Sequence, residues 1–228
     1  SAQPFTVEVT ARNSGAAATQ NYSGATFAKL TTISNAGVTT NMTGNTVAPG
    51  SFSAGLGTAT GVKYTFPTPE TAPLALVLRA TDTDLVGSSG FAEGVANLRS
   101  GRLQLQNAYG SEFLPLPVQL ALQYWNGSWQ KNASDTCSAI NASQFAWVFP
   151  AGTAPRLNYL SACESFVTVS GVAPNYAVNL SAPGAANAGW ADLTLNLGSA
   201  AAGTSCASST AGTATTANLP WLQFDWTG

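Results

Sequence analysis

Residues 102–130 constrain the fold more than any other stretch, because their side chains alternate and the chain then reverses direction. Between Val118 and Tyr124 the larger apolar side chains fall at every second position, which is the period of a β-strand with one buried face. Asn126-Gly127 follows, between two pairs that each end in tryptophan. An Asn-Gly pair between strand-like segments predicts a type I′ hairpin turn. The stretch therefore indicates β structure, and it contains no catalytic motif.

The composition indicates a surface with few charges, of the kind common in exported proteins. Only 8% of the 228 residues are charged, compared with about 25% in a typical soluble domain. The formal net charge is -2 and the 8 basic residues are scattered, so we expect no nucleic acid as a partner. No apolar run approaches the roughly 20 residues of a membrane span, and we expect no membrane insertion.

The strand-like segments predict an all-β fold made of two β-sandwich domains. We expect residues 1–98 to form an immunoglobulin-like sandwich, in which the apolar run Leu74–Leu78 is a central strand buried on both faces. Residues 81–97 are polar and glycine-rich and are predicted to form a hinge, with the domain boundary between Gly94 and Gly101. Residues 99–228 are predicted to form the second sandwich.

The end of the chain is rich in aromatic residues. Leu219–Trp226 is predicted to be a final strand, and its tryptophans would need to be buried to avoid an exposed apolar sheet edge. We therefore expect the second domain to be truncated at its C-terminus, with native sequence continuing beyond Gly228, or the strand to pair with another chain.

Several sequence blocks occur in an order that resembles one bacterial family. They are FTVEVTARNSGAAATQNYSG (5–24), LRATDTD (78–84), SGRLQLQNAYGSEFLPL (100–116), QYWNG (123–127), DTC (135–137) and LPWL (219–222). Together they resemble the C-terminal part of the MshQ-like proteins, which are large bacterial surface or secreted proteins associated with mannose-sensitive haemagglutinin and related type IV pili. The resemblance implies an exported β-rich domain, linked to pilus biogenesis or adhesion, whose partners are other pilus or surface protein chains. It supplies no catalytic motif.

Histidine is absent from the sequence. Ser-His-Asp and Cys-His mechanisms are therefore excluded, and a zinc site is not expected. A glycosidase with two carboxylates stays open as a weaker alternative, because 10 acidic residues are present. We predict that the protein is not an enzyme and that it has no cofactor, with calcium as the one candidate ion.

The three cysteines are Cys137, Cys163 and Cys206, and they indicate one disulfide and one further thiol in an exported chain. Three pairings are open. We favour Cys137 with Cys163, in which case Cys206 would suggest a partner outside this sequence.

Two groups of residues are candidates for binding. Asp82, Asp84 and Glu93 are the densest carboxylates, and they would either form turns or hold calcium, which takes several oxygen ligands. Trp125 and Trp129 would either stack on a glycan or pack across the hairpin as structural residues. The wider aromatic set consists of Tyr124, Trp125, Trp129, Trp147, Tyr159 and Trp190.

The function predicted from the sequence is structural or adhesive, in an exported, non-enzymatic domain of a pilus-associated protein outside the bacterial cell or on its surface. The alternative from another class is a carbohydrate-binding module that uses Trp and Tyr side chains, with a glycan as partner. A planar row of exposed rings would favour the alternative, whereas buried rings would favour the scaffold.

Overall fold

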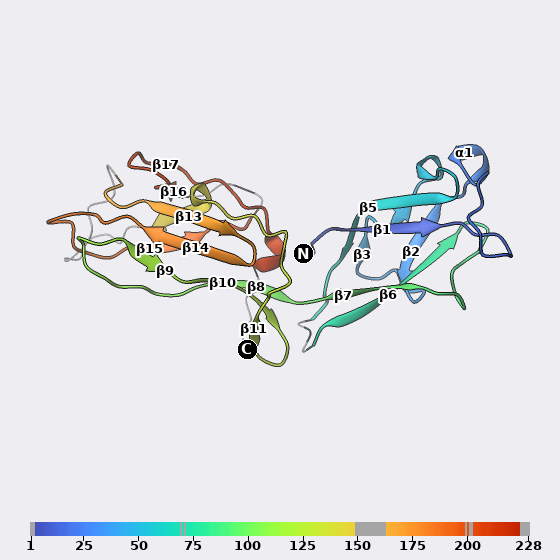
Figure 1. The fold of residues 1–228 in the computed structure, drawn as a ribbon, viewed down its shortest axis with the longest axis horizontal. Helices are drawn as coiled ribbons and strands as arrows, with labels where there is room; N and C mark the ends of the chain where they lie inside the picture. Colours follow the sequence, from blue (N-terminus) through green and yellow to red (C-terminus); the bar gives the residue numbers. More distant parts are fainter. Residues whose placement is uncertain are drawn as a thin grey trace. The chain divides into compact units, whose positions relative to one another are not determined.

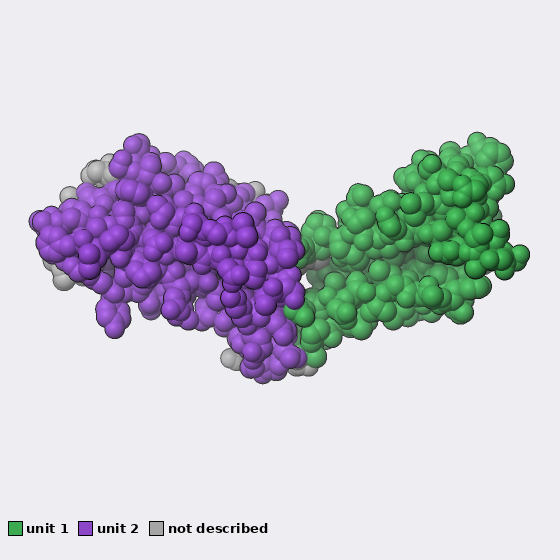
Figure 2. Space-filling view, in the orientation of Figure 1, with its two compact units in different colours: residues 1–100 green, residues 101–228 purple. Residues whose placement is uncertain are grey.

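The computed structural model describes residues 3–68, 70, 72–148, 163–198, 200 and 203–223, and these fold into antiparallel β-sheets (Figure 1). The chain divides into two compact units, Ser1–Ser100 and Gly101–Gly228, which Figure 2 distinguishes by colour. Each unit has a hydrophobic core of its own. The all-β fold class predicted from the sequence is confirmed.

The first unit is a sandwich of two antiparallel sheets, with strand orders β1-β5-β3 and β4-β2-β6-β7. Its elements are β1 (Phe5–Thr10), α1 (Gly24–Phe27), β2 (Thr31–Asn35), β3 (Met42–Thr43), β4 (Thr46–Val47), η1 (Pro49–Ser51), β5 (Leu56–Tyr64), β6 (Leu74–Asp82) and β7 (Gly94–Leu98). Both sheets contribute to the core, which consists of Val7, Ala28, Ile33, Met42, Val47, Phe52, Ala59, Val62 and Leu76. The two-sheet build is compatible with the predicted immunoglobulin-like sandwich.

Two predictions about the first unit are corrected. Residues 94–98 form β7, which pairs with β6 from Leu74↔Leu98 to Leu78↔Gly94, so the predicted hinge does not extend through Asn97. β6 does lie inside its sheet, between β2 and β7. However, Leu76 is buried while Ala75 on the opposite face is exposed, so the strand is not buried on both faces.

The second unit contains three antiparallel sheets, with strand orders β11-β10-β8, β13-β14-β9 and β15-β12-β16-β17. Its strands are β8 (Gly101–Leu105), β9 (Leu116–Val118), β10 (Leu120–Trp125), β11 (Trp129–Lys131), β12 (Phe145–Val148), β13 (Val167–Val172), β14 (Asn175–Leu180), β15 (Asp192–Leu195), β16 (Thr204–Ser205) and β17 (Gly212–Thr213). The 3-10 turn η2 (Ala142–Gln144) precedes β12, and η3 (Pro220–Leu222) follows β17. The three sheets share one core, to which β10, β12, β13 and β14 supply Leu122, Phe145, Val167 and Val178.

The alternating stretch around Val118–Tyr124 contributes strands to two different sheets. β9 pairs with β14 through Val178↔Val118, whereas β10 pairs with β8 through Leu120↔Leu105. The change of partner falls at Gln119, which belongs to neither strand. The side chains still alternate across this residue, so the sequence pattern does not reveal the break.

The predicted hairpin is present, but its turn differs from the prediction. Trp125 pairs directly with Trp129, and the connection therefore has three residues, 126–128. Gly127 adopts a left-handed conformation with φ of 77°, which glycine adopts readily. Asn126, the other residue of the pair, does not have a positive φ. The type I′ prediction, which requires positive φ at both residues, is therefore wrong.

The disulfide joins Cys163 to Cys206, so the favoured pairing of Cys137 with Cys163 is wrong. Both paired cysteines are almost fully buried in the core of the second unit. Val167 N donates a hydrogen bond to the Cys206 carbonyl oxygen at 2.8 Å, which brings the segment around Cys206 beside the start of β13. Cys137 instead lies in an exposed loop after β11, where its backbone N–H donates to Asp135 Oδ1 at 3.1 Å. Sequence spacing alone does not distinguish these pairings.

The described residues near the C-terminus are not a strand. Pro220–Leu222 form η3, which buries Leu222 next to the buried Leu219. Proline at the first position of this turn fixes its backbone and removes a strand hydrogen bond. The remainder of the predicted strand, residues 224–226, lies outside the described residues.

Candidate functional site

Trp125 and Trp129 form a compact cluster with Arg102 at the hairpin. The two indole rings meet edge to face, with centroids 5.2 Å apart and planes at 66°. Arg102 lies over the Trp129 ring, with its Cζ 4.0 Å from the centroid, and its Nε donates to Gln123 Oε1 at 2.8 Å. Partial burial lowers the pKa of Arg102, because desolvation disfavours its charged form. The cluster is therefore a cross-strand contact with an internal cation–π interaction.

The exposure of the tryptophans bears on the prediction that their rings stack on a glycan. Trp125 and Trp129 are half-buried, Trp147 is buried in the core, and Trp190 is 48% exposed on a loop. The edge-to-face geometry of Trp125 and Trp129 does not present two coplanar faces to a sugar ring. Tyr159 lies outside the described residues. The observed geometry of the hairpin pair fits the structural alternative better than the stacking one.

Glu93 is occupied by protein partners. Arg79 donates from Nε and Nη2 to Glu93 Oε1 and Oε2, at 2.8 and 3.2 Å, and Ser88 Oγ donates to Oε1 at 2.8 Å. The hydrogen bonds from Arg79, followed by the one from Ser88, lower the pKa of Glu93. This arrangement ties β6 to the segment that precedes β7.

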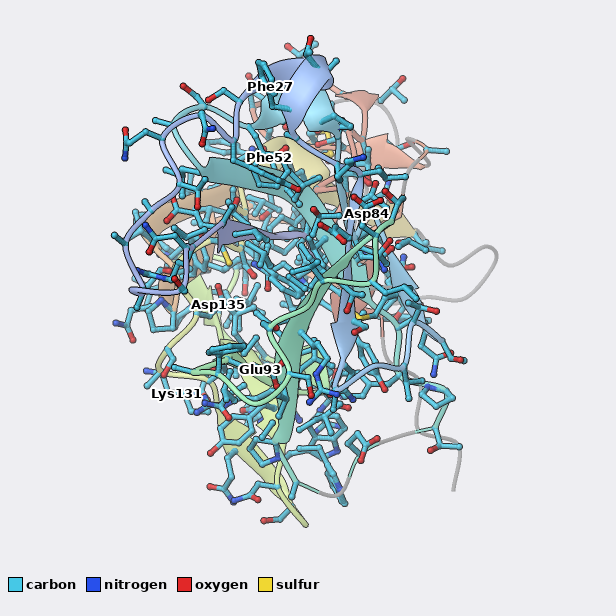
Figure 3. The ribbon with its side chains drawn as sticks, turned by 90° about the vertical axis from the view of Figure 1, so that its right-hand side faces the viewer. Phe27, Phe52, Asp84, Glu93, Lys131 and Asp135 are labelled. Atoms are coloured by element: carbon cyan, nitrogen blue, oxygen red, sulfur yellow. A yellow bond between two sulfur atoms is a disulfide. The ribbon has the colours of Figure 1, made fainter. Side chains whose placement is uncertain are left out.

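Asp82 and Asp84 have other roles. Asp82 Oδ1 accepts hydrogen bonds from the backbone N–H groups of Asp84 and Val86, both at 2.9 Å, which is the geometry of an Asx turn. Asp84 Oδ2 lies 3.2 Å from Lys29 Nζ at the surface. Figure 3 shows Asp84 and Glu93 at separate places on the first unit. In the part of the chain that the structure describes, no group of three acidic, cysteine or histidine side chains could hold a metal ion.

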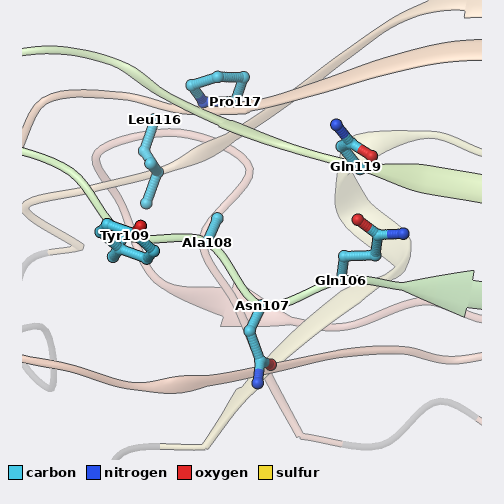
Figure 4. Close-up of a pocket in the computed structure, with 7 residues that line it drawn as sticks. All are labelled: Gln106, Asn107, Ala108, Tyr109, Leu116, Pro117 and Gln119. Atoms are coloured by element: carbon cyan, nitrogen blue, oxygen red, sulfur yellow. The ribbon is translucent and has the colours of Figure 1, made fainter.

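A pocket that the sequence reasoning missed lies between the end of β8 and β9. Its volume is about 270 Å³, and it is lined by Gln106, Asn107, Ala108, Tyr109, Leu116, Pro117 and Gln119 (Figure 4). The lining residues come from two segments that run side by side but are not paired as strands. They fall mainly within the block 100–116 of the family resemblance, which was the one available signal in the sequence.

The loop that leads from the pocket to β9 exposes large apolar side chains. Tyr109 is 96% exposed, and Phe113 and Leu114 are 62% and 65% exposed. The loop is held at its centre by the Glu112 carbonyl oxygen, which accepts a hydrogen bond from Gly184 N at 2.9 Å. Exposed apolar side chains that gather on one loop are a common feature of interaction sites.

The fold and these sites define a class of protein: a chain of two antiparallel β-sheet units, the second of which is cross-linked by a buried disulfide. Residues 99–228 match the fourth domain of DUF6701, and the chain belongs to this family. No curated protein and no solved structure matches the chain significantly. In the described residues, no helix has the length and apolar character needed to cross a membrane.

Proposed function

We propose that this chain is an exported, non-enzymatic part of a type IV pilus-associated bacterial surface protein, with a structural or adhesive role. The observation that supports the proposal most is the disulfide between Cys163 and Cys206, which lies in the core of an all-β unit with few charged residues. Disulfides form and persist in oxidising compartments, such as the periplasm and the cell exterior. The low fraction of charged residues, 8%, fits the same location.

The non-enzymatic part of the proposal is supported by how the acidic side chains are used. The sequence has no histidine, which removes the commonest general base. Glu93 is paired with Arg79, and Asp82 closes a turn. A glycosidase would need two carboxylates facing each other across a cleft.

The structural part of the role is supported by the two separate cores. Each unit buries its own apolar side chains and so can fold without a partner. Two such units in a row could act as a spacer between other parts of a surface protein. The adhesive part is supported by the exposed Tyr109, Phe113 and Leu114. The alternative of a glycan site at Trp125 and Trp129 has less support, because their edge-to-face contact suits packing.

The experiment is an attachment assay with the bacterium that produces the whole surface protein. Deletion of residues 1–228 from that protein should reduce attachment to surfaces or assembly of pili, while the shortened protein is still exported. The matched control carries Asp84→Asn in the full-length protein, since that residue forms only an exposed ion pair with Lys29. Unchanged attachment and piliation after the deletion would contradict the proposal.

A further inference from the structure

The pocket between residues 106–109 and 116–119 exists because two neighbouring segments join different sheets. Gln106 N donates to the Gln119 carbonyl oxygen at 3.0 Å, which is the last bond that continues the pairing of β8 with β10. Beyond it, β9 pairs with β14, so the segment that contains Tyr109 is left beside β9 without joining its ladder. The gap is a consequence of the strand order and needs no unusual loop.

The side chains at the two ends of the pocket differ in chemistry. Figure 4 shows the amide groups of Gln106 and Gln119 close together at one end, and Tyr109 and Leu116 near each other at the other. Each amide has both donor and acceptor groups. The lining contains no charged side chain. The pocket therefore suits an uncharged ligand with an apolar face at one end and hydroxyl or amide groups at the other.

We propose that this pocket binds a neutral saccharide. The exposed ring of Tyr109, with Leu116 and Pro117, would cover the C–H face of one sugar ring, and the amides of Gln106 and Gln119 would bond its hydroxyl groups. Tyr109 is 96% exposed, so its ring is accessible to a ligand. This site is distinct from the hairpin tryptophans, and it does not depend on the adhesive or structural role proposed above.

An extended peptide is a weaker fit for the same gap. Strand addition depends on a row of backbone donors and acceptors along a free edge. Pro117 is the middle residue of the three-residue β9, and proline has no N–H to donate. A peptide strand laid against β9 would therefore have an incomplete ladder, whereas a saccharide would use the side chains.

The test is NMR titration of the ¹⁵N-labelled chain with methyl glycosides of glucose, galactose, mannose and N-acetylglucosamine, each at millimolar concentration. At least one glycoside should shift the side-chain amide signals of Gln106 and Gln119 and the backbone signals around Tyr109. Tyr109→Ser should weaken this binding about 2- to 10-fold, because an aromatic contact is lost. Phe113→Ser is the matched control, since it removes an exposed ring that does not line the pocket and should leave the affinity unchanged.

Several results would overturn the proposal. These are the absence of shifts with all four glycosides, an unchanged affinity in Tyr109→Ser, or shifts centred on Trp125 and Trp129. Binding of an extended peptide, but of no glycoside, at residues 106–109 would also overturn it and would identify the gap as a strand-addition site. Saccharide binding with no effect of the deletion on attachment would leave this inference standing while contradicting the proposed role.

Discussion

Arg79 and Glu93 form a two-point ion pair between β6 and the segment that precedes β7. Both guanidinium contacts, at 2.8 and 3.2 Å, are made to different oxygens of the same carboxylate, and the Glu93 side chain is only 10% exposed. Such paired geometry is stronger than a single contact between exposed charges. The pair links β6 to the segment that leads into β7, the neighbouring strand of the same sheet.

The stability of the first unit should fall in acid because of this pair. The hydrogen bonds from Arg79 and Ser88 lower the folded-state pKa of Glu93 below that of the unfolded chain. Its contribution is therefore fully present above the ordinary glutamate pKa of about 4.3 and is lost as the pH falls through the lower folded value. Circular dichroism melts should show a lower melting temperature for Glu93→Gln at neutral pH and a smaller further decrease in acid than for the unchanged chain.

Asp84→Asn is the control for this measurement. The ion pair between Asp84 and Lys29 is a single contact at 3.2 Å, and both side chains are about half exposed, at 57% and 46%. Its removal should change the free energy of unfolding by less than about 1 kcal/mol. An acid dependence that is the same in Glu93→Gln and in the unchanged chain would show that the Arg79 pair does not stabilise the fold.

Loss of the disulfide should destabilise the second unit alone. Cys163 and Cys206 are 43 residues apart, and replacement of both by serine should lower the free energy of unfolding by about 2–4 kcal/mol. All 6 tryptophans lie after residue 100, so tryptophan fluorescence during urea unfolding reports on the second unit. Cys137→Ser should leave the curve nearly unchanged, because Cys137 is exposed and outside the bond. If Cys137→Ser lowered the stability as much as the replacement of both Cys163 and Cys206, the assigned pairing would be contradicted.

Trp129 is expected to stabilise the hairpin and to have no part in ligand binding. Trp129→Ala removes both the edge contact with Trp125 and the cation–π contact with Arg102, and it should cost about 1–2 kcal/mol. Urea unfolding followed by the remaining tryptophans measures this loss. Trp190→Ala, which removes a 48% exposed ring on a loop, should cost less. Loss of glycoside binding in Trp129→Ala without loss of stability would instead place the ligand at the hairpin.

Calcium should leave the melting temperature of the chain unchanged. Asp82 uses its Oδ1 in a turn, and Glu93 is paired with Arg79, so a cation would have to displace protein partners before it bound. Melts with added calcium and with a chelator test this directly. An upward shift with calcium that is abolished in Asp82→Asn would contradict the expectation and restore the metal hypothesis.

The parts of the fold that depend on local sequence could be predicted. Alternation from Leu120 to Trp125 identifies β10, and the Asn-Gly pair identifies a hairpin, because both signals lie within a few residues. The partner of a strand depends on distant residues. Nothing near Gln119 signals that β9 joins β14 while β10 joins β8. The pocket therefore could not be predicted, since it results from that divergence.

The same limit applies to the candidate sites. Asp82, Asp84 and Glu93 are close in sequence, but their oxygens are directed to different protein partners. Conversely, Cys163 and Cys206 are far apart in sequence but are joined in the core, where Val167 N also bonds the Cys206 carbonyl oxygen. Proximity along the chain is a weak guide to ligands and disulfides when β pairing is mostly long-range.

Cell-surface exposure of the native protein is the most direct test of the central claim, which is that this chain is part of an exported surface protein. Antibodies raised against residues 1–228 would be applied to intact and to permeabilised cells of the organism that produces the protein. The proposal predicts equal staining of both, and loss of the stain after intact cells are treated with protease. Staining that appears only after permeabilisation, like that of a cytoplasmic control protein, would contradict the claim.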